Sequence, residues 1–450
     1  MADTLPPDTA TVAGELRAAA LADTTALELL RRLTVEVGPR FAGTPGDAAS
    51  VAWAERTMRQ LGLANVRIEP VTVPRWVRGE AAGEILSPYP QKLHLLALGG
   101  SVGTPPGGVT APVVEVGSLE DLATRADEEI RGKIVFFNQR MERRRDGAGY
   151  GQTVGIRSRG PARAAEKGAV AVLIRSVGTG THRFPHTGGT RYAEDGERIP
   201  AAALAIPDAD ILETQLDEKD VVFRLVLGSR YEGEALSHNV IGEVVGREAP
   251  DEIVLLGAHL DSWDVGSGAI DDGSGCAVVM RAAQLIAGLD TPPRRTLRVV
   301  LFANEEFGLS GARAYAESHA DELARHHLAM ESDFGAGRVW RYAVSVRPEA
   351  VGVAESFFPL LEPLGIEWHG NTARGGADLS PLRRARVPVA DLTQDGTYYF
   401  DYHHTDDDTF DKIDPEALAQ NLAAYTVLAY LAAEVEASFT PAPEPVARRR

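Results

Sequence analysis

Side chains of types that could bind a metal ion follow three apolar runs of this chain, at the point where each run ends. They are, in chain order, His259 and Asp261, then Glu305 and Glu306, then Glu331 and Asp333. One polar ending would carry little weight, because polar residues often close strands. In α/β sheets, however, ligands bind outside the carboxyl ends of the strands, so three such endings predict a cluster of imidazole and carboxylate groups.

Two further segments supply groups of the same kind. Asp271-Asp272-Gly273-Ser274-Gly275 is a turn that leads into a predicted helix, and His403 and His404 lie in a late loop before the last helix. Neutral imidazole nitrogen and carboxylate oxygen are ligand types that suit Zn²⁺. The single cysteine, Cys276, excludes an intrachain disulfide and a cysteine-rich zinc site, so any metal ligands must be histidines and carboxylates.

The elements that must position these residues alternate between strand and helix from residue 238 onward. Strands are predicted over 239–245, 253–258, 296–302, 327–330 and 387–392. Helices are predicted over about 274–288, 311–318, 348–361 and 415–436. This alternation is typical of an α/β fold, in which a mixed, largely parallel sheet carries helices on both faces.

The region from about residue 105 to 235 has a different sequence pattern, with short β-branched runs separated by loops rich in glycine and proline. It indicates a separate, mostly β domain inserted into the α/β fold. We therefore expect an N-terminal part of the catalytic domain over 1–104, the insert over 105–235, the main catalytic domain over 236–440 and a frayed tail over 441–450. Two domains also agree with a length of 450 residues.

The overall charge excludes several classes of partner. The chain has 46 Lys and Arg residues against 64 Asp and Glu residues, which gives a net charge of −18. Such an acidic protein is a poor candidate for binding nucleic acid or an anionic membrane. No apolar run approaches the ~18–20 residues that span a bilayer. Residues 1–15 have no basic segment followed by an apolar run, so we expect a cytoplasmic protein, unless an upstream start codon adds an export signal.

The ordered motifs resemble those of the di-zinc aminopeptidase family. The matching segments are His259-Leu260-Asp261-Ser262, the turn at 271–275, Asn304-Glu305-Glu306-Phe307-Gly308, Glu331-Ser332-Asp333 and His404-Thr405. Four more segments are similar to the carboxypeptidase Q branch of that family: 259–272, Gly149-Tyr150-Gly151-Gln152-Thr153-Val154, Pro185-His186-Thr187-Gly188, and His403-His404 followed by Asp408-Thr409. The resemblance implies a zinc-exopeptidase fold with an inserted protease-associated domain, two zinc ions per chain and a homodimer.

The resemblance also implies the metal ligands. Asp271 would bridge the two zinc ions, His259 and Asp333 would complete one site, and Glu306 and His404 would complete the other. Each metal would then have three protein ligands and share a water, which is the open arrangement of a catalytic site. Two substitutes remain open, namely Glu331 in place of Asp333, and His403 in place of His404.

Catalytic roles follow from the same resemblance. Glu305 would be the general base, and Asp261 would accept the second ring N–H of His259. The peptide bond after Asp271 would be cis. Many relatives have a tyrosine that assists the oxyanion where this chain has His403, so His403 and Tyr402 are both candidates for that role.

The resemblance implies an exopeptidase that hydrolyses short peptides, either dipeptides with free termini or N-terminal residues. Alternatives are an aminopeptidase acting on longer peptides, a metal-free binding or receptor-like relative, and a cyclising enzyme on the same scaffold. A free substrate carboxylate requires a cationic or N–H donor, for which Arg374 and the basic residues between 140 and 167 are candidates. A packing role and a functional role both stay open for His186.

Overall fold

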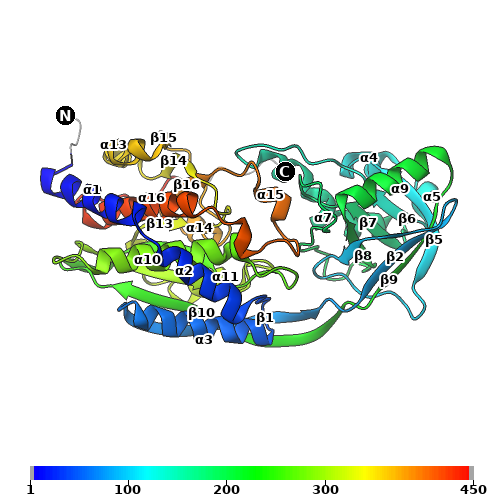
Figure 1. The fold of residues 1–450 in the computed structure, drawn as a ribbon, viewed down its shortest axis with the longest axis horizontal. Coiled ribbons are helices and arrows are strands. Elements are labelled where there is room, and N and C mark those ends of the chain that lie inside the picture. The colour runs from blue at the N-terminus through cyan, green and yellow to red at the C-terminus, as the bar shows by residue number, and fades with distance from the viewer. Residues whose placement is uncertain (1–4, 445–450) are drawn as a thin grey trace. The chain divides into compact units, whose positions relative to one another are not determined.

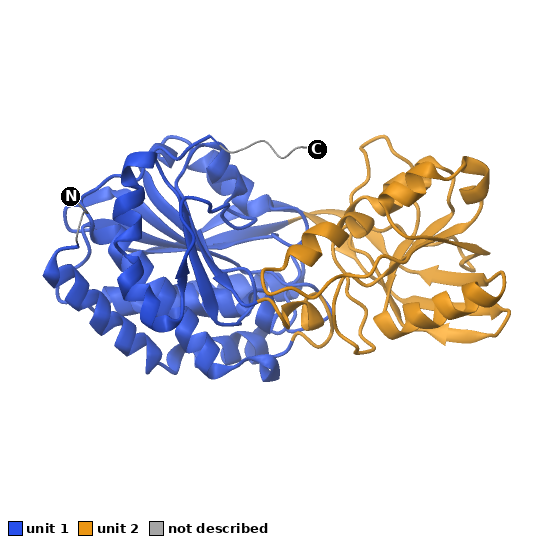
Figure 2. Ribbon diagram, turned by 90° about the horizontal axis from the view of Figure 1, so that it is seen from above, with its two compact units in different colours: residues 1–73, 236–395, 409–450 blue, residues 74–235, 396–408 orange. Residues whose placement is uncertain are grey.

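The structure is a computed structural model that describes residues 5–444 of the chain. Two compact units make it up (Figure 2). Unit 1 comprises residues 1–73, 236–395 and 409–450, and unit 2 comprises residues 74–235 and 396–408. Part of the tail predicted over 441–450 lies outside the described residues.

An eight-stranded mixed sheet forms the centre of unit 1, in the order β1-β10-β12-β11-β13-β16-β14-β15 (Figure 1). The strands are β1 (Ala64–Val77), β10 (Arg230–Val244), β11 (Ala249–His259), β12 (Arg295–Phe302), β13 (His326–Glu331), β14 (Val339–Ser345), β15 (Glu367–Trp368) and β16 (Val389–Gln394). The four middle strands, β12, β11, β13 and β16, run parallel, and β10 and β14 flank them in antiparallel pairing. Strand β12 is buried along its whole length, as expected of a strand covered on both faces.

The register of the middle strands brings their carboxyl ends together. His259, the last residue of β11, lies opposite Phe302, the last residue of β12. Two residues earlier in β11, Gly257 lies opposite Glu331 at the end of β13. The loops after these three strands therefore leave from one edge of the sheet, as the sequence predicted.

Helices cover the sheet of unit 1 on both faces (Figure 1). They include α1 (Pro7–Leu21), α2 (Thr25–Arg32), α3 (Pro45–Gln60), α10 (Ser274–Ala287), α11 (Ser310–Ser318), α14 (Ser380–Arg384) and α16 (Pro415–Glu434). Helix α16 packs against α1 and α10, and Asp414 caps its first turn by accepting from the backbone N–H groups of Glu416 and Ala417. The predicted α/β fold is thus confirmed.

One predicted helix is broken. The segment predicted as a helix over 348–361 forms a short 3₁₀ turn (Pro348–Ala350), then α12 (Val351–Glu355) and α13 (Phe358–Leu361). Pro359 stands in the first turn of α13, where its missing N–H costs no hydrogen bond. Inside an uninterrupted helix, the residue at this position would have to donate its N–H to a carbonyl one turn earlier. Proline cannot do so, and a new helix therefore begins at Phe358.

Unit 2 has a mixed eight-stranded sheet of its own, in the order β3-β2-β9-β5-β6-β7-β8-β4. The strands are β2 (Ala81–Ser87), β3 (Gln91–Leu93), β4 (Leu95–Ala97), β5 (Val109–Val116), β6 (Ile134–Phe137), β7 (Ala171–Arg175), β8 (Ala201–Leu204) and β9 (Val222–Leu227). The helices are α4 (Leu119–Thr124), α5 (Asp127–Ile130), α6 (Ala148–Thr153), α7 (Gly155–Ser158), α8 (Gly160–Glu166), α9 (Ile206–Glu218) and α15 (Tyr399–Tyr402).

The extent of unit 2 differs from the expected insert. It begins at residue 74 rather than 105, because β2 pairs with β9 and β4 pairs with β8 of the same sheet. It also includes residues 396–408, which lie far along the chain in the segment expected to belong to the catalytic domain. Below, "the insert" means residues 74–235. Its likeness to a protease-associated domain stays a prediction.

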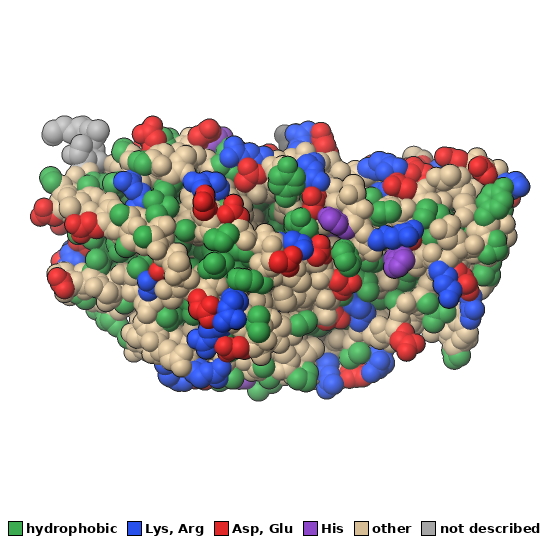
Figure 3. All heavy atoms as spheres, in the orientation of Figure 1, with side chains coloured by type: hydrophobic (Ala, Val, Ile, Leu, Met, Phe, Trp, Pro, Cys, Tyr) green, Lys and Arg blue, Asp and Glu red, His purple; other side chains and the backbone are tan. Residues whose placement is uncertain are grey.

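The basic residues between 140 and 167 are largely engaged in ion pairs inside unit 2. Arg140 pairs with Asp210 and Glu213, and Arg143 pairs with Asp401. The surface in view has the same character, with basic and acidic side chains interspersed rather than gathered by sign (Figure 3). Among residues 5–444, none of the helices combines the length and the apolar character needed to cross a bilayer.

Candidate metal centre

Unit 1 brings three of the predicted ligands together at the carboxyl edge of its sheet. The Nε2 atom of His259 lies 3.1 Å from Oδ1 of Asp271 and 3.4 Å from Oδ1 of Asp333. One ligand atom from each of the three residues lies within 4.8 Å of the others. His259 is fully buried, Asp271 is buried and Asp333 is partly exposed. This geometry suits a single divalent cation held by one imidazole and two carboxylates.

The ring of His259 is oriented by a backbone carbonyl. Its Nδ1 lies 3.0 Å from the main-chain oxygen of Asp261, whereas the nearest carboxylate oxygen of Asp261 is 3.8 Å away. A carbonyl only accepts, so Nδ1 carries the proton and Nε2 faces the two aspartates. Asp261, the residue expected to accept the second ring N–H of His259, therefore does so through its backbone carbonyl.

The Asp261 carboxylate instead holds the loop that carries Glu305 and Glu306. Its two oxygens accept from the backbone N–H groups of Glu305 at 3.0 Å and of Glu306 at 3.3 Å. Asn304, just before them, adopts a left-handed conformation with φ 58°, which asparagine tolerates better than most residues. Its side-chain amide donates to Ser310 Oγ at 2.7 Å, which closes the loop. Glu306 is not part of the group of three.

The two acidic residues after β13 have different surroundings. The Glu331 carboxylate accepts from the backbone N–H groups of Asp378 at 3.2 Å and of Leu379 at 3.4 Å. A Cβ atom at Gly376 would lie 1.8 Å from Oε2 of Glu331, so this close approach requires glycine. Glu331 therefore anchors the loop before α14, and Asp333 is the residue that reaches His259.

The carboxylates at this edge of the sheet are destabilised by burial and by one another, which favours the binding of cations. Burial raises the pKa of Glu305 well above its usual range, and the Asp333 carboxylate adds to the shift. Burial likewise raises the pKa of Glu331 to about 8 and that of Asp378 well above its usual range. For His259, burial opposes protonation, but the Asp333 and Asp271 carboxylates outweigh it and raise the pKa. So many buried carboxylates are unfavourable without cations, and this donor set fits divalent metal ions.

The turn after β11 is shaped as the resemblance implied. The peptide bond between Asp271 and Asp272 is cis, which confirms that prediction. Asp272 is fully buried, and its carboxylate accepts from the backbone N–H of His259 at 3.1 Å and of Gly275 at 3.1 Å. It therefore ties the end of β11 to the start of α10, which holds Asp271 in front of His259.

Sequence reasoning missed Arg40, a fully buried arginine that fixes the loop between His259 and Asp271. Its guanidinium donates to the carbonyl oxygens of Leu260 at 2.5 Å, Ser267 at 2.6 Å and Gly268 at 2.8 Å. The nearest of these partners is 220 positions along the chain, so no local pattern could reveal the contact.

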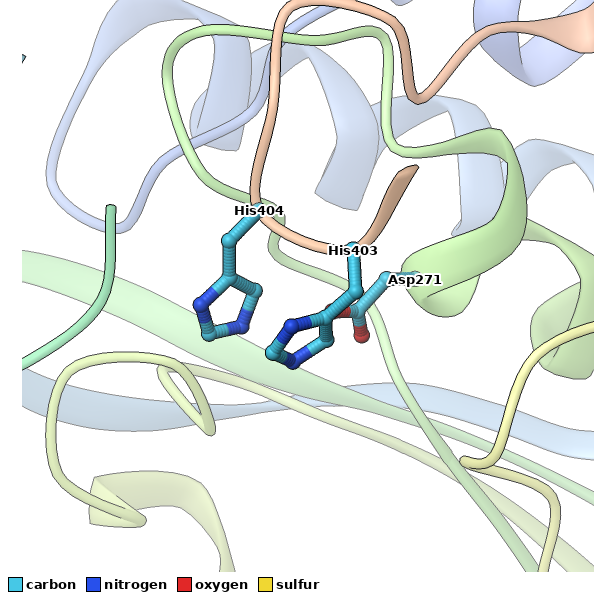
Figure 4. A group of neighbouring side chains, drawn as sticks. All are labelled: Asp271, His403 and His404. Atoms are coloured by element: carbon cyan, nitrogen blue, oxygen red, sulfur yellow. The ribbon is translucent and has the colours of Figure 1, made fainter. Parts of the chain in front are cut away.

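The late-loop histidines belong to unit 2. The rings of His403 and His404 stack with centroids 3.5 Å apart and an interplanar angle of 21°. Figure 4 shows the two rings and also draws Asp271, which belongs to unit 1. Both histidines are buried, and His404 has a left-handed backbone with φ 63°. Metal binding by His404 or His403 together with unit 1 residues stays a prediction.

Comparison with known proteins places this geometry in a family. Residues 239–429 match the model of peptidase family M28. Carboxypeptidase Q of Xenopus laevis is 37% identical over 401 residues, which cover 89% of this chain and 84% of that protein. Aminopeptidase YwaD of Bacillus subtilis is 25% identical over 426 residues, which cover 91% of this chain and 85% of that protein.

A solved structure agrees over nearly the whole length. The crystal structure of a peptidase M28 precursor from Shewanella amazonensis is 49% identical, has a TM-score of 0.95, and covers 97% of this chain and 99% of that chain. The predicted relation to carboxypeptidase Q and the predicted enzyme class, a metallopeptidase, are thus confirmed. The chain belongs to peptidase family M28.

Proposed function

We propose that this peptidase is a zinc-dependent exopeptidase that hydrolyses short peptides, either dipeptides with free termini or N-terminal residues. The observation that carries the proposal is the largely buried group of His259, Asp271 and Asp333, set among further carboxylates at the edge of the sheet. The similarity to carboxypeptidase Q over most of both chains supports an exopeptidase.

In this proposal two zinc ions bind per chain. Asp271 contributes to both sites, with His259 and Asp333 at one and Glu306 and His404 at the other. The nitrogen and oxygen donors of this set are those that zinc prefers, and no cysteine competes. When bound, the ions would supply Lewis acidity toward the scissile carbonyl and lower the pKa of a water.

The residues of the chain perform the proton transfers. Glu305 takes the proton of the attacking water on a carboxylate oxygen and returns it to the nitrogen of the leaving amine. The Asp261 carboxylate, which holds the backbone N–H of Glu305, keeps this base in position. His403 or Tyr402 donates a hydrogen bond to the oxyanion of the tetrahedral intermediate.

A substrate panel with and without a chelator tests the proposal. Dipeptides, amino-acyl arylamides and longer peptides are incubated with purified enzyme, and zinc per chain is measured after dialysis. We expect about two zinc ions, hydrolysis of dipeptides, and loss of activity with the chelator that added zinc restores. An enzyme that requires both free termini would leave the arylamides intact. Hydrolysis that resists the chelator, or a protein that holds no zinc, would contradict the proposal; a zinc-free protein would fit a receptor-like role.

Aminopeptidase activity on longer peptides is the second candidate. The similarity to aminopeptidase YwaD along most of both chains favours it. In the same panel it would appear as hydrolysis of arylamides and stepwise release of N-terminal residues from longer peptides.

A further inference from the structure

The insert surrounds the late-loop histidines with contacts that sequence reasoning left unassigned. Residues 396–408 belong to unit 2, so their packing against the insert is internal to that unit. Two insert segments make these contacts: Pro185-His186-Thr187-Gly188, and the short helices α6 and α7, which carry Tyr150 and Arg157.

Thr187 holds both the backbone and the ring of His404. The backbone N–H of Thr187 donates to the carbonyl oxygen of His404 at 3.0 Å, next to its left-handed backbone. A non-glycine residue keeps this disfavoured conformation only where its surroundings enforce it. The carbonyl oxygen of Thr187 also lies 3.2 Å from Nδ1 of His404. A carbonyl only accepts, so this contact is made by the tautomer that carries its proton on Nδ1, in which Nε2 keeps the lone pair that a metal needs.

Arg157 fixes the carbonyl that orients the ring. It is buried, and its Nη1 donates to the Thr187 oxygen at 3.3 Å while its Nη2 donates to the Tyr150 hydroxyl at 2.6 Å. Nη1 also lies 3.3 Å from Nδ1 of His404, to which it can donate only in the tautomer with the ring proton on Nε2. A carbonyl oxygen has two lone pairs, so it can accept from the guanidinium and from the imidazole together.

His186 fixes the preceding residue. Its Nδ1 lies 2.7 Å from the carbonyl oxygen of His403, which again can only accept. The backbone N–H of His186 donates to Ser176 Oγ at 2.8 Å, and that hydroxyl donates to the Leu204 carbonyl on β8 at 2.6 Å. His186 is thus anchored to the insert sheet, and it holds the late loop one residue before His404.

Two glycines leave room for these side chains. A Cβ atom at Gly188 would lie 2.4 Å from the guanidinium carbon of Arg157, and one at Gly178 would lie 2.3 Å from the ring of His186. Both distances are shorter than those that Cβ atoms show in proteins, so a side chain at either position would have to displace Arg157 or His186.

We propose that Arg157 and His186 are positioning residues, which hold the zinc ligand His404 from the insert. This inference rests on the proposed function, in which His404 binds one of two zinc ions. The loop that carries this ligand then takes its conformation from contacts with the insert, within unit 2.

Zinc affinity tests the inference with a readout independent of turnover. Competition with a chromophoric chelator gives the dissociation constants of both zinc ions for the wild type and for Arg157→Met, His186→Gln and His186→Asn. We expect Arg157→Met and His186→Gln to weaken one zinc about 10–100-fold and leave the other unchanged. His186→Asn should restore most of the affinity, because the asparagine amide nitrogen replaces Nδ1 as the donor to His403, whereas glutamine places its amide too far out.

The matched control is Arg163→Met, which removes an exposed insert arginine that pairs with Glu166 and should leave both affinities unchanged. Folded variants that keep wild-type affinity for both ions would overturn the inference. If a melting curve shows that Arg157→Met does not fold, Tyr150→Phe takes its place. This variant removes only the hydroxyl that accepts from Arg157. Unchanged zinc affinity in Tyr150→Phe would again overturn the inference.

His404→Ala tests the proposed zinc ligand apart from the residues that position it. It should release one zinc and keep the other. If it keeps both, or if the wild type binds fewer than two, the proposed ligand set fails and the inference fails with it. If His404→Ala behaves as expected while the Arg157 and His186 variants bind zinc like the wild type, only the inference fails.

Discussion

At the scale of single residues, a backbone hydrogen bond links Glu305 to the carboxylate of Asp261. The base has a raised pKa and lies on a loop whose backbone donates to the Asp261 carboxylate. Asp261 also presents its carbonyl to the ring of His259. One residue thus positions the proposed base through its side chain and a proposed ligand through its backbone.

Replacing Glu305 by glutamine tests the assignment of the base. Glutamine keeps the size of the side chain but cannot take a proton, so Glu305→Gln should lower kcat on the best dipeptide about 10²–10⁴-fold. Zinc content should not change, because Glu305 is not among the proposed ligands. Glu317→Gln, at an exposed position on α11, serves as the control. Turnover within tenfold of the wild type would remove Glu305 from the mechanism.

His319 gives unit 1 a pH-dependent stability. Its Nε2 lies 2.9 Å from Oε2 of Glu69, and its Nδ1 lies 2.5 Å from Oε1 of Glu322. Burial opposes protonation, but the two carboxylates outweigh it and raise the pKa of His319 to about 9. Because the folded value exceeds the unfolded value of about 6.5, the stabilisation is complete below about pH 6.5 and is lost as the pH rises through about 9.

Melting temperatures of the wild type and His319→Gln, measured at about pH 6 and about pH 10, check this. At the lower pH the wild type should melt several degrees higher than His319→Gln. This difference between the two proteins should shrink at the higher pH. His94→Gln, at an exposed position, controls for general effects of losing a histidine. A difference that grows with pH would contradict the assignment.

Elements with a local signal in the sequence were predicted well. Strands β11, β12 and β13 are short apolar runs that polar residues close or follow, and this pattern alone locates both the strands and the edge where these side chains meet. Strand β14 was missed, because Arg341 interrupts its apolar run. In the sheet, Arg341 lies opposite Thr393 of β16 and donates to its hydroxyl at 3.3 Å, so a cross-strand partner compensates for the charge.

Contacts between residues that are distant in the sequence could not be predicted. The contribution of one such set, made by Arg40, can be measured directly. Arg40→Met should leave three carbonyl groups of the loop after β11, two of them buried, without their donor, which should lower the free energy of unfolding by about 3 kcal/mol. Denaturant unfolding of the variant against Arg56→Met, an exposed arginine on α3, provides the comparison. Equal unfolding free energies would show that the loop keeps its conformation without the guanidinium.

For the whole molecule, the sequence predicted two domains and an insert over 105–235, whereas unit 2 begins at residue 74 and also contains residues 396–408. Residues 396–408 join unit 2 through contacts such as Arg143 with Asp401 and Thr187 with His404. No change in composition marks that segment, because its assignment depends on partners more than two hundred positions earlier.

Oligomeric state is also a property of the whole molecule. The resemblance to carboxypeptidase Q implies a homodimer, so light scattering on the eluted protein should give about twice the chain mass of 48.2 kDa. The mass should stay constant on tenfold dilution if the dimer is stable. A mass of one chain at every concentration would contradict the prediction.

The division of unit 2 into two stretches, 74–235 and 396–408, limits how this enzyme can be shortened. Excising the first stretch to obtain a compact peptidase would strip the second of the neighbours that shape it. Grafting the first stretch onto another scaffold would likewise leave its matching loop behind. Recombination between relatives would therefore have to exchange both stretches as one cassette, although they are encoded far apart.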